Sequence, residues 1–309
     1  MLVEILGSAA GGGFPQWNCA CPNCRSLREG TFAGKARTQV QVAIKGDSSS
    51  WFLLNASPDL RTQIESNPRL HPVASPRHSP ISGAVLTGAD LDQVLGLLLL
   101  RELQPLHVYS TASVRGILCE HNSMFGMLQR VANQATWIEV APGARFPLVS
   151  PSGENSGICC TMISLGTHFP AYVTADQKAG LQPREASSGL ILESAAGRKI
   201  GFLPAVPAVD EALMAQLQSV DLLLFDGTFW SDRELIEING EGQTARQMGH
   251  VPVSSPEGSL RKLASLRKPR KIFVHINNTN PMLNESGPEF RQVCEAGWEI
   301  AEDGWQFEL

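Results

Sequence analysis

The stretch Val220-Asp221-Leu222-Leu223-Leu224-Phe225, followed by Asp226-Gly227-Thr228, decides the fold. Its apolar run is typical of a strand that is covered by other elements on both faces of a central sheet. Asp226 then stands at the carboxyl end of that strand, where open α/β sheets place their ligands. The segment therefore predicts an α/β protein with a polar site at this edge of a sheet.

The two halves of the chain repeat one order of elements around this strand. Each half begins with strand-like segments joined by short turns and continues with alternating strands and helices. We expect buried strands at 83–87 and 271–276 and helices at 92–102 and 209–218. Such a repeat predicts two sheets packed face to face with helices outside. We expect a single α/β (α+β) domain over residues 1–309, built as a four-layer αββα sandwich.

Composition narrows the class of protein. The 309 residues are 43% hydrophobic and 18% charged, which is a globular profile, and no apolar stretch approaches the roughly 20 residues of a membrane helix. The first seven residues have no basic segment followed by an apolar one, so we expect no signal peptide and a cytoplasmic protein. The net charge of −5 disfavours nonspecific binding to nucleic acid.

Three of the seven cysteines lie within six residues. Cys19, Cys21 and Cys24 follow a glycine-rich turn, and three thiolates at this spacing suit a structural zinc ion, which normally takes a fourth ligand. A disulfide is the alternative, but three thiols cannot pair among themselves and the nearest two would form a strained ring. The cluster therefore predicts a zinc site that is completed by a distant residue.

Polar side chains end three of the expected strands. Asp90 and Asp92 follow the strand at 83–87, Asp226 ends the central strand, and His275 follows the strand that begins at 271. Carboxylates and an imidazole at the carboxyl ends of strands favour a hard or borderline cation. Any one of these carboxylates taken alone is better explained as a cap on backbone amides, and only the set favours metal.

The residues after the strand at 83–87 resemble the signature of the metallo-β-lactamase-like hydrolases, His-x-His-x-Asp-His. Here the signature reads Gly88-x-Asp90-x-Asp92-Gln93, so only Asp92 is identical to the signature. Asp90 can still bind a metal ion, and Gln93 offers an amide oxygen. The resemblance implies the metallo-β-lactamase fold. Loss of the three imidazoles of the signature disfavours two zinc ions and favours a single iron, manganese or magnesium ion.

Further segments make the chain similar to the coenzyme PQQ synthesis protein B (PqqB) family along its whole length. These are the cysteine cluster, Gly96-Leu97-Leu98-Leu99-Leu100-Arg101-Glu102, Asp226-Gly227-Thr228-Phe229-Trp230, Met248-Gly249-His250-Val251-Pro252 and His275-Ile276-Asn277-Asn278-Thr279-Asn280-Pro281. The resemblance implies a cytoplasmic role in making pyrroloquinoline quinone (PQQ) from a peptide that supplies tyrosine and glutamate. It leaves open contacts with other PQQ pathway proteins and a homodimer.

Matched residue by residue, the resemblance assigns roles to single side chains. Asp226 and His275 correspond to superfamily metal ligands, His250 is implied as a ligand, proton shuttle or substrate contact, and His168 lies where a further metal histidine would fall. Arg101 is a candidate contact for an anionic quinone. The catalytic set is therefore expected to comprise Asp90, Asp92, Asp226, His250 and His275.

The fourth zinc ligand is also implied by resemblance. In related phosphodiesterases with the same cysteine cluster, a histidine three positions after the final active-site histidine completes the zinc site, and here that position is Asn278. Cys294 and water are the alternatives.

Three functions stay open from the sequence. The first is metal-dependent oxidation, with iron favoured, that hydroxylates the tyrosine-derived precursor. The second is a non-enzymatic carrier that takes part in transport of PQQ or its precursor to the periplasm. The third is a hydrolase that uses metal-bound hydroxide.

Overall fold

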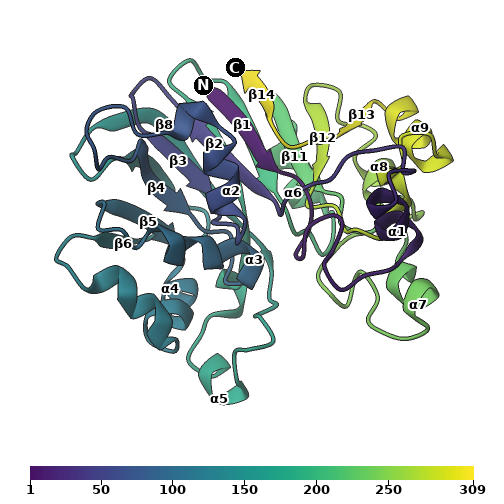
Figure 1. Cartoon of the computed structure of the whole chain (residues 1–309), viewed down its shortest axis with the longest axis horizontal. Helices are drawn as coiled ribbons and strands as arrows, with labels where there is room; N and C mark the ends of the chain where they lie inside the picture. The colour runs from purple at the N-terminus through teal and green to yellow at the C-terminus, as the bar shows by residue number, and fades with distance from the viewer. The chain divides into compact units, whose positions relative to one another are not determined.

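The computed structural model describes residues 1–309, and the chain divides into two compact units. Unit 1 comprises Met1–Leu6, Gln41–Arg198 and Gly304–Leu309, and unit 2 comprises Gly7–Val40 and Lys199–Asp303. Figure 1 labels the helices and strands of both units. The expectation of one domain over the whole chain stays a prediction.

Unit 1 contains a seven-stranded mixed sheet in the order β14-β1-β2-β3-β4-β5-β6. Strand β14 pairs antiparallel with β1, so the two chain termini lie side by side, whereas β3, β4, β5 and β6 are mutually parallel (Figure 1). The strands are β1 (Leu2–Gly7), β2 (Gln41–Lys45), β3 (Trp51–Leu54), β4 (Ile81–Val85), β5 (Leu106–Ser110), β6 (Ala135–Glu139) and β14 (Trp305–Glu308).

An antiparallel meander and short helices complete unit 1. The meander consists of β7 (Arg145–Val149), β8 (Asn155–Gly166) and β9 (Ser187–Ser194). The α-helices are α2 (Leu60–Glu65), α3 (Leu91–Val94), α4 (Ala112–Cys119) and α5 (Ala175–Lys178), and the 3₁₀ helices are η1 (Pro68–Leu70), η2 (Leu95–Leu100), η3 (Ser123–Gln129) and η4 (Pro183–Glu185). Apolar side chains of the sheet and helices form one core cluster, which includes Leu53, Ala84, Leu97, Val108 and Ile117.

The expected continuous helix at 92–102 is wrong, because this stretch is α3 followed by the 3₁₀ helix η2. The carbonyl of Gln93 accepts a hydrogen bond from Ala56 N (2.6 Å), and Gly96 N donates to Ala56 O (2.9 Å). A Cβ atom at Gly96 would lie 2.2 Å from Ser57 O. The backbone is thus tied to the segment after β3 instead of continuing its own i→i+4 ladder.

Unit 2 is built on four parallel strands, β10 (Lys199–Leu203), β11 (Leu222–Asp226), β12 (Arg270–Val274) and β13 (Trp298–Ile300). Parallel neighbours require crossover connections, which here contain helices. The helices are α1 (Pro22–Arg28), α6 (Glu211–Leu217), α7 (Glu234–Asn239), α8 (Ser259–Lys262), α9 (Pro288–Glu295) and the 3₁₀ helix η5 (Pro281–Leu283). Phe273 stacks on Trp298 in the buried core of this unit.

The predicted central strand is β11, and its five residues are all buried. It pairs with β12 so that Asp226 lies opposite Val274, which places His275 one residue beyond the end of the neighbouring strand. No helix of the structure has the length and apolar character needed to cross a lipid bilayer.

Candidate metal centres

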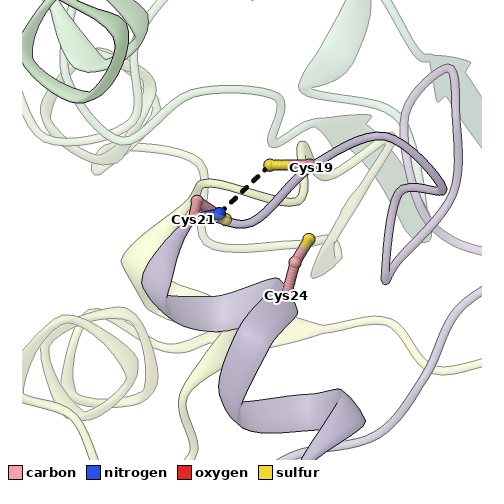
Figure 2. Close-up of side chains that lie close together, drawn as sticks. All are labelled: Cys19, Cys21 and Cys24. Carbon is pink, nitrogen blue, oxygen red and sulfur yellow. Dashed lines mark hydrogen bonds between the residues drawn. The ribbon is translucent and has the colours of Figure 1, made fainter.

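The cysteine cluster lies at the start of α1. Cys21 is the residue before the helix, Cys24 lies in its first turn, and Cys21 N donates a hydrogen bond to Cys19 Sγ (3.4 Å). Figure 2 shows the three side chains gathered around one point. Their sulfurs lie within 4.8 Å of one another, and all seven cysteines of the chain are free thiols. The spacing read from the sequence therefore forms a three-sulfur site and no disulfide.

The side-chain amide of Asn278 completes the surroundings of these sulfurs. Its Nδ2 atom lies 3.1, 3.6 and 3.3 Å from the sulfurs of Cys19, Cys21 and Cys24, and the residue is buried. The same carboxamide turned by 180° would present Oδ1, the atom that a metal ligand uses. Cys294 is exposed on α9 and is not part of the cluster. Asn278 therefore lies next to all three sulfurs, and its role as the fourth zinc ligand stays a prediction.

The three thiols do not ionise alike in the absence of a cation. Burial raises the pKa of Cys21 to about 11. At Cys19 partial burial is outweighed by hydrogen bonds from Cys21, Cys24 and Asn278, which lower the pKa of that thiol. Three neighbouring thiolates repel one another, so a divalent cation is the natural means of holding all three in the ionised form.

A second cluster joins Asp226, His250 and His275, with one donor atom of each within 4.8 Å of the others. Asp226 ends β11 and His275 follows β12. His250 comes from the loop after α7, where Gly249 adopts a positive φ of 85° and Val251 N donates to Val206 O (2.6 Å). All three side chains are buried. The cluster therefore offers two imidazoles and one carboxylate at the predicted edge of the parallel strands.

A hydrogen-bond network around Thr228 fixes these three side chains. The Thr228 hydroxyl lies 2.6 Å from Asp226 Oδ1, 2.7 Å from His275 Nδ1 and 3.0 Å from His250 Nδ1. Asp226 Oδ2 accepts from Val206 N (2.8 Å) and lies 2.8 Å from His250 Nδ1. The two imidazole rings stack with centroids 5.2 Å apart. Both carboxylate oxygens thus have two donors each.

The network determines where the imidazole protons lie. A carboxylate only accepts, so His250 Nδ1 must donate to Asp226, and the single Thr228 proton points to Asp226 Oδ1. The Thr228 oxygen must then accept from His275 Nδ1. In both rings Nε2 carries the lone pair, which is the arrangement that orients a histidine toward a metal ion.

Thr228 and Glu234 are site residues that sequence analysis did not identify. Glu234 on α7 is buried, and burial raises its pKa to about 7. Its carboxylate accepts from Trp230 N (2.6 Å) and from the Thr279 hydroxyl. The only sequence signal for Thr228 was its position two residues after Asp226, where hydroxyl side chains commonly bond to a strand-end aspartate.

The loop after β12 links the two clusters within unit 2. His275 has a positive φ of 55°, Asn277 N donates to Thr228 O (3.0 Å), and Asn278 lies against the sulfurs. The Thr279 hydroxyl donates to Glu234. The four consecutive residues 275–278 therefore join the imidazole cluster to the cysteine cluster.

The remaining predicted residues belong to unit 1. Asp90 precedes α3 without making a side-chain cap to it, and Asp92 is half-buried in its first turn. Arg101 and His168 are exposed, Arg101 at the end of η2 and His168 after β8. That Asp90 and Asp92 bind the cation held by Asp226 and His275 stays a prediction.

Gln93 has an unusual environment in unit 1. Its side chain is 4% exposed, and Oε1 has no hydrogen-bond partner. A Cβ atom at Gly88 would lie 2.5 Å from that oxygen, so the absence of a side chain at Gly88 makes room for the Gln93 amide. A buried acceptor left without a donor costs about 1 to 3 kcal/mol. This oxygen is therefore suited to receive a donor or a cation.

Comparison with known proteins identifies the family. Residues 50–276 match the model of the beta-lactamase superfamily domain. The chain is 40% identical to coenzyme PQQ synthesis protein B of Methylobacterium radiotolerans over 100% of both chains, and 38% identical to that of Gluconacetobacter diazotrophicus over 97% of each. Zn²⁺-bound PqqB from Methylobacterium extorquens superposes with a TM-score of 0.91 at 37% identity over 100% of both chains.

The structural match confirms the expected fold class, a metallo-β-lactamase fold with two mixed sheets flanked by helices. A diphosphatase of the PhnP family shares this fold at a TM-score of 0.67 and 18% identity, covering 100% of this chain and 97% of its own. The relative from Methylobacterium extorquens is a zinc-bound protein. By sequence over its full length and by structure, the chain belongs to the PqqB family of the metallo-β-lactamase superfamily.

Proposed function

We propose that the chain catalyses a metal-dependent oxidation in PQQ biosynthesis, namely hydroxylation of a tyrosine-derived precursor. The observation that carries the proposal is the donor set of the buried cluster. Asp226, His250 and His275 supply one carboxylate and two imidazoles within 4.8 Å. This is the composition that non-haem iron oxygenases use.

The residues of the cluster fit a single cation. Thr228 and Asp226 hold the Nδ1 protons of both histidines, so the Nε2 atoms keep the lone pairs that a metal ion requires. In this proposal Asp226 joins them as a ligand by exchanging one of its hydrogen-bond donors for the cation. A redox-active ion such as iron would supply one-electron chemistry with dioxygen when bound. Because the three side chains are buried, bulk water is largely kept from them, which protects an oxidising site from side reactions.

The cysteine cluster has a separate role in this proposal. Three soft sulfur donors, with the Asn278 amide beside them, suit a structural zinc ion. The loop from His275 to Asn278 connects that zinc to the imidazole cluster, so we assign to the zinc the positioning of His275. The substrate in this proposal is PQQ's peptide-derived precursor, and the other PQQ pathway proteins would supply it.

Anaerobic reconstitution tests the proposal. The protein is purified without metal at the imidazole cluster, loaded with ferrous iron, and exposed to air with the precursor peptide while oxygen uptake and product mass are followed. With a reductant such as ascorbate added, we expect oxygen uptake that depends on iron and precursor. One atom of dioxygen should enter the product as a hydroxyl group, and the other should leave as water with two electrons from the reductant. Asp92→Ala and His275→Ala should abolish both, whereas Asp210→Asn, an N-cap change on α6, should have no effect.

Two results would contradict the proposal. Unchanged turnover in Asp92→Ala or His275→Ala would remove the metal site from the reaction. Tight binding of PQQ by metal-free protein, with no oxygen uptake after iron loading, would favour the carrier function instead. Hydrolysis of the precursor without oxygen uptake would favour the hydrolase.

A further inference from the structure

An indole side chain in unit 2 is presented to solvent by a braced loop. Trp17 is 86% exposed, which is exceptional for tryptophan. The loop around it is fixed, because Arg28 donates to the carbonyls of Gln16 and Cys19, and Cys19 N donates to Gln16 O (3.1 Å). The exposure of Trp17 therefore does not reflect a loose loop, and little conformational entropy would be lost if the indole were bound.

A pocket of about 680 Å³ opens beside this loop. One wall is the cysteine loop itself, and the other carries the apolar side chains Leu235, Ile238 and Met248. Ile238 and Met248 are 40% and 39% exposed, so this wall is apolar surface in contact with water. Side-chain amides of Asn18 and Asn239 also line the pocket and could accept a hydrogen bond from an indole N–H. No charged side chain lines it.

We propose that a second copy of this chain occupies the pocket, with Trp17 of each copy inserted into the pocket of the other. Charge supports this occupant. Residues 16–29, which carry the tryptophan, have a net charge of +1 from Arg25, Arg28 and Glu29. Residues 232–241, which carry the apolar wall, have a net charge of −2 from Asp232, Arg233, Glu237 and Glu241, since Glu234 is buried against Thr279. In a two-fold arrangement the basic loop of one copy meets the acidic helix α7 of the other twice.

The expected size of the contact fits a weak, reversible dimer. Two inserted indoles bury about 300 to 500 Å² and cover a similar area of pocket wall, which approaches the lower limit of about 1,200 Å² for a stable interface. Methionine on the wall adapts to an aromatic ring. Because so few residues supply the area, Trp17 should behave as a hot spot of the interface.

The test is sedimentation equilibrium of the full chain over a range of concentrations. We expect a monomer and dimer in exchange, with dimerisation weakened at least about tenfold in Trp17→Ala. Val73→Ala is the matched control, since Val73 is 85% exposed and lies in unit 1 away from the pocket, and it should leave the dimer unchanged. Zinc content and circular dichroism should be equal in all variants, since neither side chain is part of the core.

A variant on the opposite wall separates reciprocal insertion from other dimers. Ile238→Glu should weaken self-association as Trp17→Ala does, because it places a charge in the apolar wall. Mixing the two variants should restore association in part, since the mixed dimer keeps one of the two insertions: the indole of one chain in the intact pocket of the other. A wild-type monomer at all concentrations, an unaffected Trp17→Ala dimer, or no association on mixing would each overturn the proposal.

Discussion

The two clusters of unit 2 differ in what holds them together. The cysteine cluster takes its three sulfurs from six consecutive residues, and its one side-chain partner from another segment is Asn278. The imidazole cluster takes its ligands from three distant segments, and hydrogen bonds with Thr228, Val206 and Asp226 fix both Nδ1 atoms and both carboxylate oxygens. The first is therefore expected to depend on its metal for shape, and the second to keep its shape without one.

This difference shows how the loop from His275 to Asn278 can contribute both to a metal-dependent fold and to a preorganised metal site. A metal that organises thiols contributes directly to folding, whereas side chains held by hydrogen bonds are preorganised to receive a cation. The segment from His275 to Asn278 belongs to both clusters. Each prediction below alters one cluster and asks whether the other responds.

The largest effect is expected from the cysteine cluster. Cys24→Ala should release zinc and lower stability by about 3 to 5 kcal/mol, or roughly 10 °C in melting temperature, because the remaining two thiols lose the cation that binds them. Cys294→Ser is the control and should retain both zinc and stability, since that thiol is exposed and outside the cluster. Zinc analysis and calorimetry give the answer, and a zinc-free Cys24→Ala protein of unchanged stability would contradict it.

Asp226→Asn should act on the imidazole cluster with a smaller loss of stability. An amide accepts at one end only. Either Val206 N and His250 Nδ1, which share Oδ2, or the Thr228 N–H and hydroxyl, which share Oδ1, therefore lose their acceptor, at about 2 to 4 kcal/mol. Metal affinity of the cluster should fall about 10- to 100-fold while zinc at the cysteines is kept. Urea unfolding and metal titration measure the two quantities. Loss of the cysteine-bound zinc in this variant would contradict the prediction, because it would show that a change in the imidazole cluster alters the cysteine cluster.

Thr228 tests whether the hydroxyl orients the histidines. Thr228→Val removes the atom that accepts from His275 Nδ1 and should weaken metal binding by about tenfold. Thr228→Ser keeps the hydroxyl and should restore affinity to near the original value. Metal titration followed by calorimetry compares the two variants, and equal affinities in both would remove Thr228 from the site.

The smallest effect is a pH dependence from Glu234. Burial raises the pKa of Glu234 to about 7, above its value in the unfolded chain. The folded state therefore holds this proton where the unfolded state has lost it, so stability falls as pH rises from about 4.5 to 7 and is lower above that range. Glu234→Gln should flatten this part of the profile, by about 1 to 3 kcal/mol between pH 5 and 8. Parallel profiles in urea unfolding would exclude the effect.

Sequence reasoning succeeded where one element carries its own signal. The apolar run at 220–225 predicts a covered strand, and its end at Asp226 beside the end of β12 follows from parallel pairing. The three cysteines form their site because their spacing is local. These features need no knowledge of distant contacts.

Other features depend on contacts that the sequence does not display. The helix expected at 92–102 is interrupted because Gly96 meets the backbone at Ala56, some forty residues earlier. Thr228 acts through its position between two imidazoles from separate loops, and Glu234 through burial against Thr279. Strands β7, β13 and β14 were not predicted. β13 and β14 are three and four residues long, and β14 pairs with β1 at the other end of the chain. β7 pairs with its neighbour β8 but contains Pro147, a residue disfavoured within strands.

The positive φ of His275 has a consequence for the evolution of the chain. A left-handed backbone costs a non-glycine residue about 1 to 2 kcal/mol, so glycine at this position would relieve the conformation. Glycine would also empty the buried space of the imidazole and remove its bond to Thr228, so the contacts of the side chain offset part of the cost of its backbone. Histidine here marks a position where robustness is given up in favour of chemistry.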